Sequence, residues 1–292
     1  MNRTTLEQWR MLQAVVEHGG FAQAAAAIHK SQSTINHAVH KLQDQLGLPL
    51  LVVVGRKAQL TEAGALMLRR AGQLLVQASQ LEDIAGSLAL GTEAEISLAV
   101  DELYPYQQLA AVLRTFSETF PNTRVELFET VLSGGAELLH AARVDLLVAG
   151  EVPGGFLGEP VLNTEFVAVA ASEHPLHQLG RPITLQDLQR ERQIVIRDSG
   201  QGRRADAGWL GAEQRWTVSH VATSMAMISR GLGFAWLPLS RVCGALADGS
   251  LQELRLERGA RRYATLYLTF ADRDKAGPAA CHLADLFVRA QQ

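Results

Sequence analysis

Cysteine is scarce in this sequence, and its two cysteines, Cys243 and Cys281, lie far apart. No CxxC pair occurs, which argues against a disulfide framework and against a zinc site built from thiolates. No apolar run is long enough to span a bilayer, and the first residues lack the apolar core of a signal peptide. From these absences we expect a protein of the reducing cytoplasm, with no membrane partner and no structural metal.

The motifs of common enzyme active sites are also missing. The chain contains no GxSxG, no phosphate-binding P-loop and no HExxH. His174 and His177 form an HxxH in a proline loop without a nearby cysteine, so we assign them no metal. We therefore expect a protein that is not an enzyme and needs no cofactor. Its 292 residues and its hydrophobic fraction of 47% are those of about two globular domains.

Positive and negative charges are distributed unevenly along the chain, whose formal net charge is −3. Residues 1–61 carry six Lys or Arg and three Asp or Glu, a balance of +3. Residues 62–90 carry two basic and three acidic side chains, and residues 91–292 carry 19 and 24, so their balances are −1 and −5. A small positive head on a larger acidic body indicates that the head is the part that meets a polyanion.

The head has the pattern of three helices. Thr5 and Gln8 have the spacing of a capping box, and apolar residues then recur at helical intervals until Gly19. An alanine-dense stretch from residue 21 to residue 28 predicts a short second helix that packs closely. Ser31 is a good N-cap for a third helix, because its hydroxyl can accept a hydrogen bond from the first turn.

The third predicted helix has a polar face without acids. Residues 30–43 contain no Asp or Glu, and the apolar residues at 35, 39, 42 and 46 form one stripe that we expect to be buried. The opposite face offers groups that hydrogen-bond base edges and phosphates, as a helix in a major groove requires. We assign DNA binding to Ser31, Gln32, Ser33, Thr34, Asn36, His37, His40 and Lys41. The alternative is that this face is simply solvated.

A second feature, in residues 50–64 (LLVVVGRKAQLTEAG), favours DNA binding over the solvated alternative. Two β-rich runs, residues 51–54 and 58–60, flank Gly55-Arg56-Lys57, which predicts a hairpin with two cations at its tip. We call this hairpin the wing. Its tip can contact a minor groove or a phosphate backbone, so Arg56 and Lys57 join the predicted DNA contacts. Thr61 has the position of a cap for the next helix.

Residues 6–66 resemble the winged helix-turn-helix of LysR-type transcriptional regulators. The stretches GGFAQAAAAIHKSQSTINHAVHKLQDQLGLPLL and LTEAG carry the resemblance, in order and in spacing. Some positions depart from the usual pattern of the family: Gly20 and Ser33 stand where Ser and Pro are usual, and Asn36 and His37 where Ser and Arg are usual. These departures lie on or near the reading face, so the fold is expected, whereas the operator sequence cannot be borrowed from relatives.

Residues 62–90 predict one long helix, because they contain no proline and repeat apolar residues in heptads. The predicted dimerisation seam comprises Met67, Ala71, Leu74, Ala78, Leu81, Ala85 and Leu88. A helix of about 28 residues is about 42 Å long, and its leucines need cover from a second helix or from the chain's own body. The spacing leaves both open. The resemblance implies antiparallel paired linkers, hence a homodimer or homotetramer on two DNA half-sites.

Residues 91–292 alternate strands and helices, which is typical of a parallel α/β sheet. The resemblance to the same family implies a two-lobed, periplasmic-binding-protein-like effector domain. Lobe one would comprise residues 91–162 and 267–292, lobe two would comprise residues 163–266, and two crossing strands would form the hinge. The predicted fold is thus an N-terminal all-α winged helix-turn-helix (1–61), a linker helix (62–90) and a C-terminal α/β effector domain (91–292).

Ligands of open α/β sheets bind beyond the carboxyl ends of the strands, where helix N-termini supply N–H groups. The loops at those ends predict effector contacts from Asp101, Glu102, Thr130, Ser133, Asp198, Ser199, Gly200, Thr223 and Ser224. Two acids at the mouth, Asp101 and Glu102, would disfavour an anion. They would favour an amine or a zwitterion, or else cap the next helix.

These features together predict a sequence-specific DNA-binding transcriptional regulator whose C-terminal domain senses a small-molecule effector. The expected partners are double-stranded DNA with promoter half-sites, the effector, further copies of the chain and RNA polymerase. The alternative is a ligand-independent DNA-binding regulator or architectural protein.

Overall fold

The structure is a computed structural model that describes residues 3–54, 57–89, 91–202 and 208–290. The chain divides into two compact units, Met1–Leu90 and Gly91–Gln292. Each unit has a hydrophobic core of its own. No helix in the described ranges combines the length and the apolar character that crossing a membrane requires.

The N-terminal unit is a three-helix head with a hairpin and a long helix, as predicted. Its elements are α1 (Leu6–Glu17), α2 (Phe21–Ala27), α3 (Gln32–Leu46), β1 (Leu51–Val54), β2 (Lys57–Leu60) and α4 (Glu62–Ala89). The capping box is present, since the Thr5 and Gln8 side chains each accept a hydrogen bond from the other's backbone N–H. Ser31 caps α3 by accepting from Thr34 N–H at 3.1 Å. Local sequence therefore sets where both helices begin.

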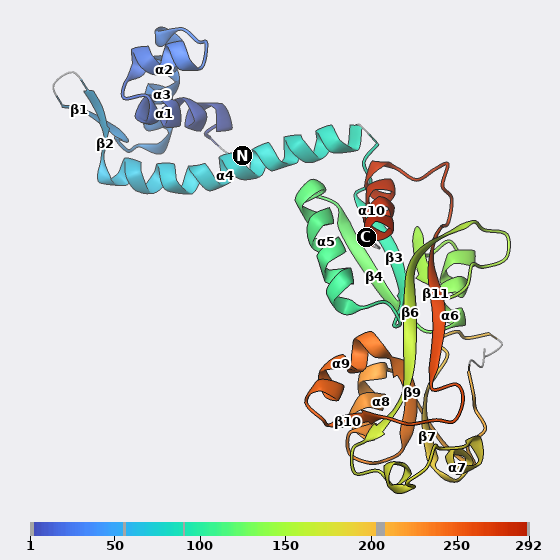
Figure 1. The fold of residues 1–292 in the computed structure, drawn as a ribbon. Helices are drawn as coiled ribbons and strands as arrows, with labels where there is room; N and C mark the ends of the chain where they lie inside the picture. The colour runs from blue at the N-terminus through green and yellow to red at the C-terminus, as the bar shows by residue number, and fades with distance from the viewer. Residues whose placement is uncertain (1–2, 55–56, 90, 203–207, 291–292) are drawn as a thin grey trace. The chain divides into compact units, whose positions relative to one another are not determined.

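The head core forms where the stripe of α3 meets α1 and α2. Ile35, Val39 and Leu42 are buried, and Leu46 packs against the same core. β1 and β2 pair antiparallel from Leu51 opposite Leu60 to Val54 opposite Lys57. Figure 1 shows this hairpin beside the helices of the head. Arg56, one of the two cations predicted at the wing tip, lies outside the described residues.

The long helix α4 is fixed to the head at its start. Thr61 Oγ1 accepts from Gly64 N–H at 2.9 Å, and Ala71 and Leu75 are buried in the head core. Met67 packs against that core as well. Met67 and Ala71 belonged to the predicted dimerisation seam, but the chain's own head covers them, because the heptad repeat begins where α4 still lies on α1. Farther along α4 the apolar residues are exposed, 53% for Leu74 and 68% for Leu81.

The C-terminal unit is an α/β structure on one nine-stranded sheet, whose strand order is β4-β3-β5-β11-β6-β9-β7-β8, with β10 paired to β6. Its strands are β3 (Glu95–Asp101), β4 (Arg124–Thr130), β5 (Leu146–Ala149), β6 (Gly158–Ala171), β7 (Arg192–Ile196), β8 (Gln214–Val218), β9 (Phe234–Pro238), β10 (Leu251–Glu253) and β11 (Arg261–Phe270). Its helices are α5 (Tyr106–Thr119), α6 (Ser133–His140), the 3-10 helix η1 (Pro175–Gln178), α7 (Leu185–Arg190), α8 (Val221–Ile228), α9 (Leu239–Ala247) and α10 (Pro278–Arg289).

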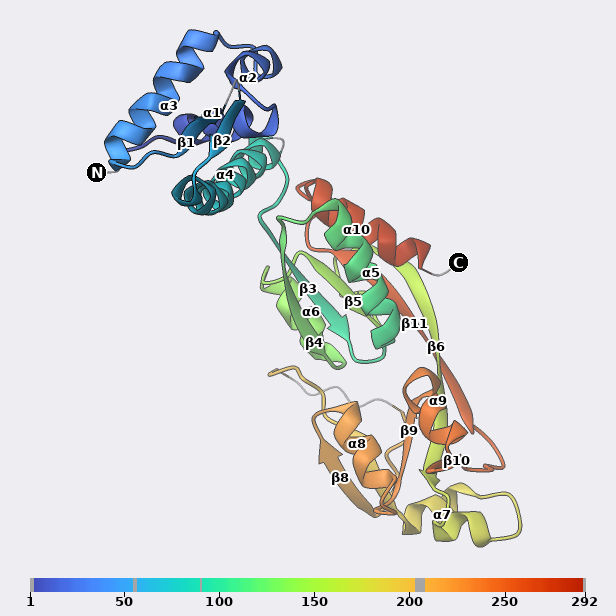
Figure 2. The same ribbon diagram turned by 90° about the vertical axis from the view of Figure 1, so that its left-hand side faces the viewer.

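Two long antiparallel strands, β6 and β11, run side by side through this unit and join its two lobes (Figures 1 and 2). In lobe one, β3 pairs parallel with β4 and with β5. In lobe two, β7 pairs parallel with β8 and with β9. The parallel strands of each lobe are flanked by helices, which confirms the predicted two-lobed α/β architecture.

Helices cover both faces of the sheet in each lobe. In lobe one, α5 and α10 pack on one face, where Tyr104, Phe116 and Phe287 are almost fully buried, and Leu139 of α6 is buried on the other face. In lobe two, α8 and α9 pack on one face, while the segment with η1 and α7 covers the other. Figure 2 shows that the carboxyl ends of the parallel strands of lobe one point toward lobe two.

Candidate functional site

The predicted reading face of α3 lies on the surface of the head. Its eight predicted side chains are all exposed: Ser31, Gln32, Ser33, Thr34, Asn36, His37, His40 and Lys41. Ser31 also has a local task, since its hydroxyl caps the helix and lies 2.9 Å from Ser33 Oγ and 2.7 Å from Thr34 Oγ1. The remaining polar side chains of the face, Gln32, Asn36, His37, His40 and Lys41, are exposed.

The wing is tied to α3 through a glutamine that lies beside the reading face. Gln43 Oε1 accepts from Leu50 N–H at 2.7 Å and from Leu51 N–H at 3.0 Å. This side chain therefore holds the start of β1 at the C-terminal half of α3. Lys57, the second predicted cation of the wing, belongs to β2.

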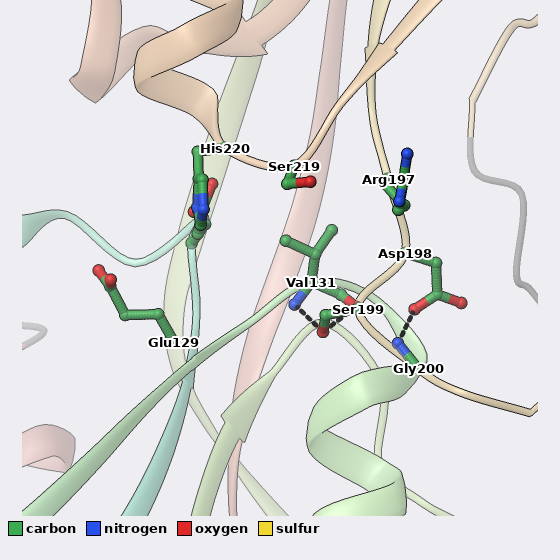
Figure 3. Close-up of a pocket in the computed structure, with 9 residues that line it drawn as sticks. Glu129, Val131, Arg197, Asp198, Ser199, Gly200, Ser219 and His220 are labelled. Carbon is green, nitrogen blue, oxygen red and sulfur yellow. Dashed lines mark hydrogen bonds and ion pairs between the residues drawn. The ribbon is translucent and has the colours of Figure 1, made fainter.

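The C-terminal unit contains a cavity of about 300 Å³ where the strand ends of the two lobes meet (Figure 3). Lobe one lines it with Glu102, Glu129 and Val131, and lobe two lines it with Arg197, Asp198, Ser199, Gly200, Ser219 and His220. This volume suits a small metabolite, and the mixture of charged side chains, hydroxyls and backbone N–H groups suits a polar one.

On one side of the cavity, Glu102 of lobe one reaches across to lobe two. Its Oε2 accepts from Val221 N–H at 2.9 Å, and its Oε1 lies 2.9 Å from His220 Nδ1. Glu102 is only 4% exposed. A carboxylate at a helix N-terminus satisfies an orphan N–H and interacts favourably with the helix dipole. Glu102 therefore caps α8, a helix of the opposite lobe.

On the other side, Asp198 of lobe two caps a helix of lobe one. Its Oδ1 accepts from Ser133 N–H at 3.0 Å and from Gly200 N–H at 2.9 Å, and its Oδ2 accepts from Ser133 Oγ at 2.7 Å. Ser199 and Val131 add backbone contacts beside it, with Ser199 N–H donating to Val131 O at 3.1 Å. Each lobe thus supplies the N-terminal cap of a helix in the other lobe.

A third carboxylate extends the Asp198 contacts along the same loop. Glu137 of α6 accepts from Gln201 N–H at 2.8 Å and from Gly202 N–H at 2.9 Å. The loop that follows β7 is therefore held to lobe one by both acids. A shift of the backbone of this loop would break hydrogen bonds to the carboxylates of Asp198 and Glu137.

Four of the nine predicted effector residues line the cavity: Glu102, Asp198, Ser199 and Gly200. Ser133 contacts it indirectly through Asp198, and Thr130 and Ser224 are buried below the surface. Thr223 is exposed and does not line it. Of the two alternatives for Asp101 and Glu102, a cap on the next helix is not what the structure shows, because the N-cap of α5 is Pro105, which makes no side-chain cap, and Glu102 caps α8 instead.

Five lining residues were not predicted: Glu129, Val131, Arg197, Ser219 and His220. Each lies within two residues of the C-terminal end of β4, β7 or β8. Ligands bind at the carboxyl ends of parallel strands. Applying this rule to every residue at the end of each strand predicts these five residues as well.

Asp101, the remaining predicted residue, does not line the cavity but bonds to the backbone beside it. It is 4% exposed, and its carboxylate accepts from Leu103 N–H at 2.9 Å and from Leu132 N–H at 3.2 Å. Leu132 has a φ of 52°, a left-handed conformation that costs leucine about 1–3 kcal/mol. Asp101 therefore helps to hold the strained residue from which α6 begins.

Burial raises the pKa of Asp101 to about 6, with Glu102 and Asp198 adding smaller repulsive contributions and the two N–H bonds opposing the shift. Because the folded protein then holds this proton more tightly than the unfolded chain, stability falls as pH rises from 4 to 6. The quantity to follow is the unfolding free energy of the native protein minus that of Asp101→Asn. We expect this difference to fall by up to about 3 kcal/mol between pH 4 and pH 6 and to stay constant above pH 6. Urea unfolding followed by tryptophan fluorescence measures this difference; parallel pH profiles would contradict it.

Comparison with known proteins matches each of the two units to a protein family profile. Residues 6–65 match the family profile described as bacterial regulatory helix-turn-helix protein, lysR family, and residues 90–292 match the one described as LysR substrate binding domain. The chain is 30% identical over 262 residues to YeeY, an uncharacterised HTH-type transcriptional regulator of Escherichia coli K12, covering 86% of this chain and 83% of that protein.

Solved structures share the fold. The virulence activator AphB of Vibrio cholerae matches with a TM-score of 0.56 and 18% identity, covering 99% of this chain and 100% of that one. CrgA of Neisseria meningitidis, a LysR-type transcriptional regulator, matches with a TM-score of 0.55 and 22% identity, covering 99% and 100%. The chain therefore belongs to the LysR-type transcriptional regulators, DNA-binding helix-turn-helix proteins that carry a substrate-binding domain.

Proposed function

We propose that this regulator reads a promoter half-site with α3 and the wing, pairs with a second copy through α4, and responds to a small molecule held between the lobes of its C-terminal unit. The observation that carries the proposal is the acid-free, exposed polar face of α3 on a head whose charge balance is +3. Such a face meets phosphates without repulsion and presents both donors and acceptors to base edges.

The cavity supports the sensing part of the proposal over a ligand-independent role. It is lined by both lobes, so a bound molecule changes the free energy of one lobe arrangement relative to another. Beside the strands β6 and β11, the described lobes are joined near the cavity by hydrogen bonds such as those of Glu102 and Asp198, and a bound molecule would add contacts to both lobes. Acting at promoters in the cytoplasm, the regulator would transmit this change to RNA polymerase through the spacing or bending of its DNA sites.

The DNA contacts are tested by separating base readout from phosphate binding. We expect Asn36→Ala and His37→Ala to relax selection at particular bases, each by about 1–3 kcal/mol, because both side chains present hydrogen-bonding groups to a groove. Arg56→Ala is expected to weaken binding to all duplexes alike, since a wing cation contacts backbone phosphates. The measurement is equilibrium binding to duplexes selected by the native protein and to scrambled ones.

His18→Ala is the matched control, because His18 is also an exposed histidine but ends α1 rather than lying on α3. It should bind both duplexes as the native protein does. Equal losses on selected and scrambled DNA for Asn36→Ala, His37→Ala and Arg56→Ala would refute the division into readout and backbone contacts. Failure of the native protein to bind any duplex at low salt would refute the function itself.

A second copy is proposed to cover the exposed part of α4. Leu74 and Leu81 share a helix face with Ala78 and Ala85, and the two leucines are 53% and 68% exposed. Packing of two such faces buries them as in a coiled coil. We restrict the proposed seam to the part of α4 beyond Ala71, because the head covers the earlier positions.

The association is tested with Leu81→Asp, which places a charge at the centre of the proposed interface. We expect a change from dimer or tetramer toward monomer in sedimentation equilibrium, with the dissociation constant raised at least about 100-fold, because an unpaired buried charge is costly. Ser79→Asp is the control, as it adds the same charge to an exposed position on another face of α4. An unchanged mass for Leu81→Asp would place the interface elsewhere.

A further inference from the structure

We infer that the cavity between the lobes selects a zwitterionic ligand of amino-acid size, with its ammonium group toward Glu129 and its carboxylate toward Arg197, and that it rejects simple anions. This inference rests on the proposed effector role of the cavity and names the chemical class of the effector. Two observations support it. Side chains of the protein already bind the helix N-termini at the cavity, and the exposed charged side chains of the lining are Glu129 and Arg197.

The first step concerns the helix N-termini, which are the usual sites for an anion in an α/β protein. Here the N-terminus of α8 is occupied by Glu102, through Val221 N–H, and the N-terminus of α6 is occupied by Asp198, through Ser133 N–H. An anionic ligand would have to displace a buried carboxylate that belongs to the protein. Both positions are therefore closed to it.

The second step concerns charge. The described lining residues include three carboxylates, on Glu102, Glu129 and Asp198, and one guanidinium, on Arg197. Counted from these four side chains, the lining carries a formal charge of −2, from three negative charges and one positive charge. A cavity of this sign attracts a cationic group and repels a molecule whose charge is only negative.

The third step is to identify the charges that a ligand can reach. Glu102 and Asp198 are 4% and 6% exposed. One oxygen of each accepts from backbone N–H, and the other contacts a side chain, His220 for Glu102 and Ser133 for Asp198. Glu129 and Arg197 are both exposed at the cavity. Among the described acidic and guanidinium side chains of the lining, Glu129 and Arg197 are therefore the exposed ones, and Glu129 has one hydrogen bond, from Tyr106.

Glu129 and Arg197 come from different lobes and lie on opposite sides of the group of lining residues in Figure 3. Ser199 and Ser219 lie between them as neutral polar groups. In Figure 3 the Glu129 carboxylate points away from Arg197, so a ligand with an ammonium group at one end and a carboxylate at the other would pair with both side chains, and bridge the lobes, after rotation of the exposed Glu129 side chain. A cavity of about 300 Å³ accepts a molecule of that size.

Glu129 is oriented by its own neighbours in the same way as many binding carboxylates. The Tyr106 hydroxyl hydrogen-bonds to it, and Arg241 of lobe two stacks on the Tyr106 ring at 3.6 Å from its centroid. Tyr106 therefore contacts both Glu129 of its own lobe and Arg241 of the other lobe.

The experiment uses the full chain and three sets of probes in calorimetric titrations. The probes are the twenty standard amino acids, their α-methyl esters, which lose the main-chain carboxylate but keep the ammonium group, and their Nα-acetyl derivatives, which lose the ammonium group but keep the main-chain carboxylate. We expect at least one amino acid to bind, and its ester and its N-acetyl derivative to bind at least about tenfold more weakly. Glu129→Gln should remove the preference over the N-acetyl derivative, and Arg197→Gln the preference over the ester.

Three results would overturn the inference: heat from none of the twenty amino acids, binding of an N-acetyl derivative or of succinate as tight as that of the amino acid, or binding that neither variant changes. Glu126→Gln is the matched control, because Glu126 is an exposed glutamate of β4 that does not line the cavity. Binding of succinate in the cavity would leave the proposed function standing and reject only the ligand class. DNA binding of the same samples tests the proposed function separately.

Discussion

Replacement of Gly64 by alanine is expected to destabilise the N-terminal unit by about 3 kcal/mol or more and to abolish its binding to DNA. Gly64 lies in the first turn of α4, and a Cβ atom there would lie 2.0 Å from the carbonyl oxygen of Leu50. That oxygen is backbone and accepts from Thr61 N–H at 3.0 Å, so it cannot move without breaking the joint between the wing and α4. A backbone atom cannot rotate away as a flexible side chain can, so the steric clash with the added methyl group would destabilise the fold.

The matched control is Gly72→Ala, in the same helix. A Cβ at Gly72 would meet no described atom within 4 Å. Alanine is a better helix former than glycine, so this variant should be more stable than the native protein by about 0.5–1 kcal/mol. The two variants make the same chemical change and are expected to have opposite effects, which separates close packing from helix propensity.

Amide hydrogen exchange read by mass spectrometry measures both variants, because peptides from residues 6–60 report the opening of the head alone. We expect faster exchange throughout those peptides in Gly64→Ala and unchanged or slower exchange in Gly72→Ala. Native protection in Gly64→Ala, together with native DNA affinity, would show that the contact with Leu50 is not needed for the head to fold.

Removal of the Glu102 carboxylate is the second change for which we expect a large effect, a loss of about 3–5 kcal/mol from the C-terminal unit in Glu102→Ala. The substitution leaves Val221 N–H at the start of α8 without its charged partner and removes the contact with His220. A charged hydrogen bond contributes about 1.5–3 kcal/mol, and a water molecule from the cavity would replace this charged acceptor only with a neutral one. The lobes should also separate more readily.

Glu93→Ala is the control for this variant, because Glu93 caps a helix within one lobe. Its carboxylate accepts from Ala279 N–H at 3.0 Å and from Ala280 N–H at 3.1 Å, at the start of α10. Loss of that cap should cost about 1–2 kcal/mol without affecting contacts between lobes. Urea unfolding measures the stability of both variants, and hydrogen exchange of peptides around residues 198–202 and 219–224 measures the lobe contacts.

Only Glu102→Ala is expected to accelerate exchange in those two segments. If Glu93→Ala accelerates it equally, the effect of Glu102 is general destabilisation rather than loss of a bond between lobes. If neither variant changes exchange there, the carboxylate of Glu102 does not hold the lobes together.

Family, function class and the architecture of both units could be predicted from the sequence, because the signals are local. The capping box at Thr5, the cap at Ser31 and the buried stripe of α3 each involve residues within one helix, and the structure confirms all three. The alternation of strands and helices in residues 91–292 is likewise a local pattern. The need for glycine at position 64 is not a local signal, since its cause is the carbonyl of Leu50, fourteen residues earlier.

The heptads of α4 show where local pattern stops being sufficient. An apolar stripe packs against any apolar surface, so its period cannot tell the head of the same chain from a second copy. Tertiary structure decided that Ala71 and Leu75 are buried in the head and that Leu81 is not. The limit of the head core along the helix is a property of the folded unit.

The sequence by itself determined that acids and hydroxyls gather at the strand ends of an α/β domain, because alternation and turn chemistry can be read within short segments. Only the tertiary structure decided that Glu102 caps α8 and that Asp198 caps α6, since these bonds join residues 119 and 65 positions apart. The physical reason is that a carboxylate binds whichever orphan N–H group folding brings within about 3 Å. That distance is set by the approach of two lobes, which no short segment of the chain encodes.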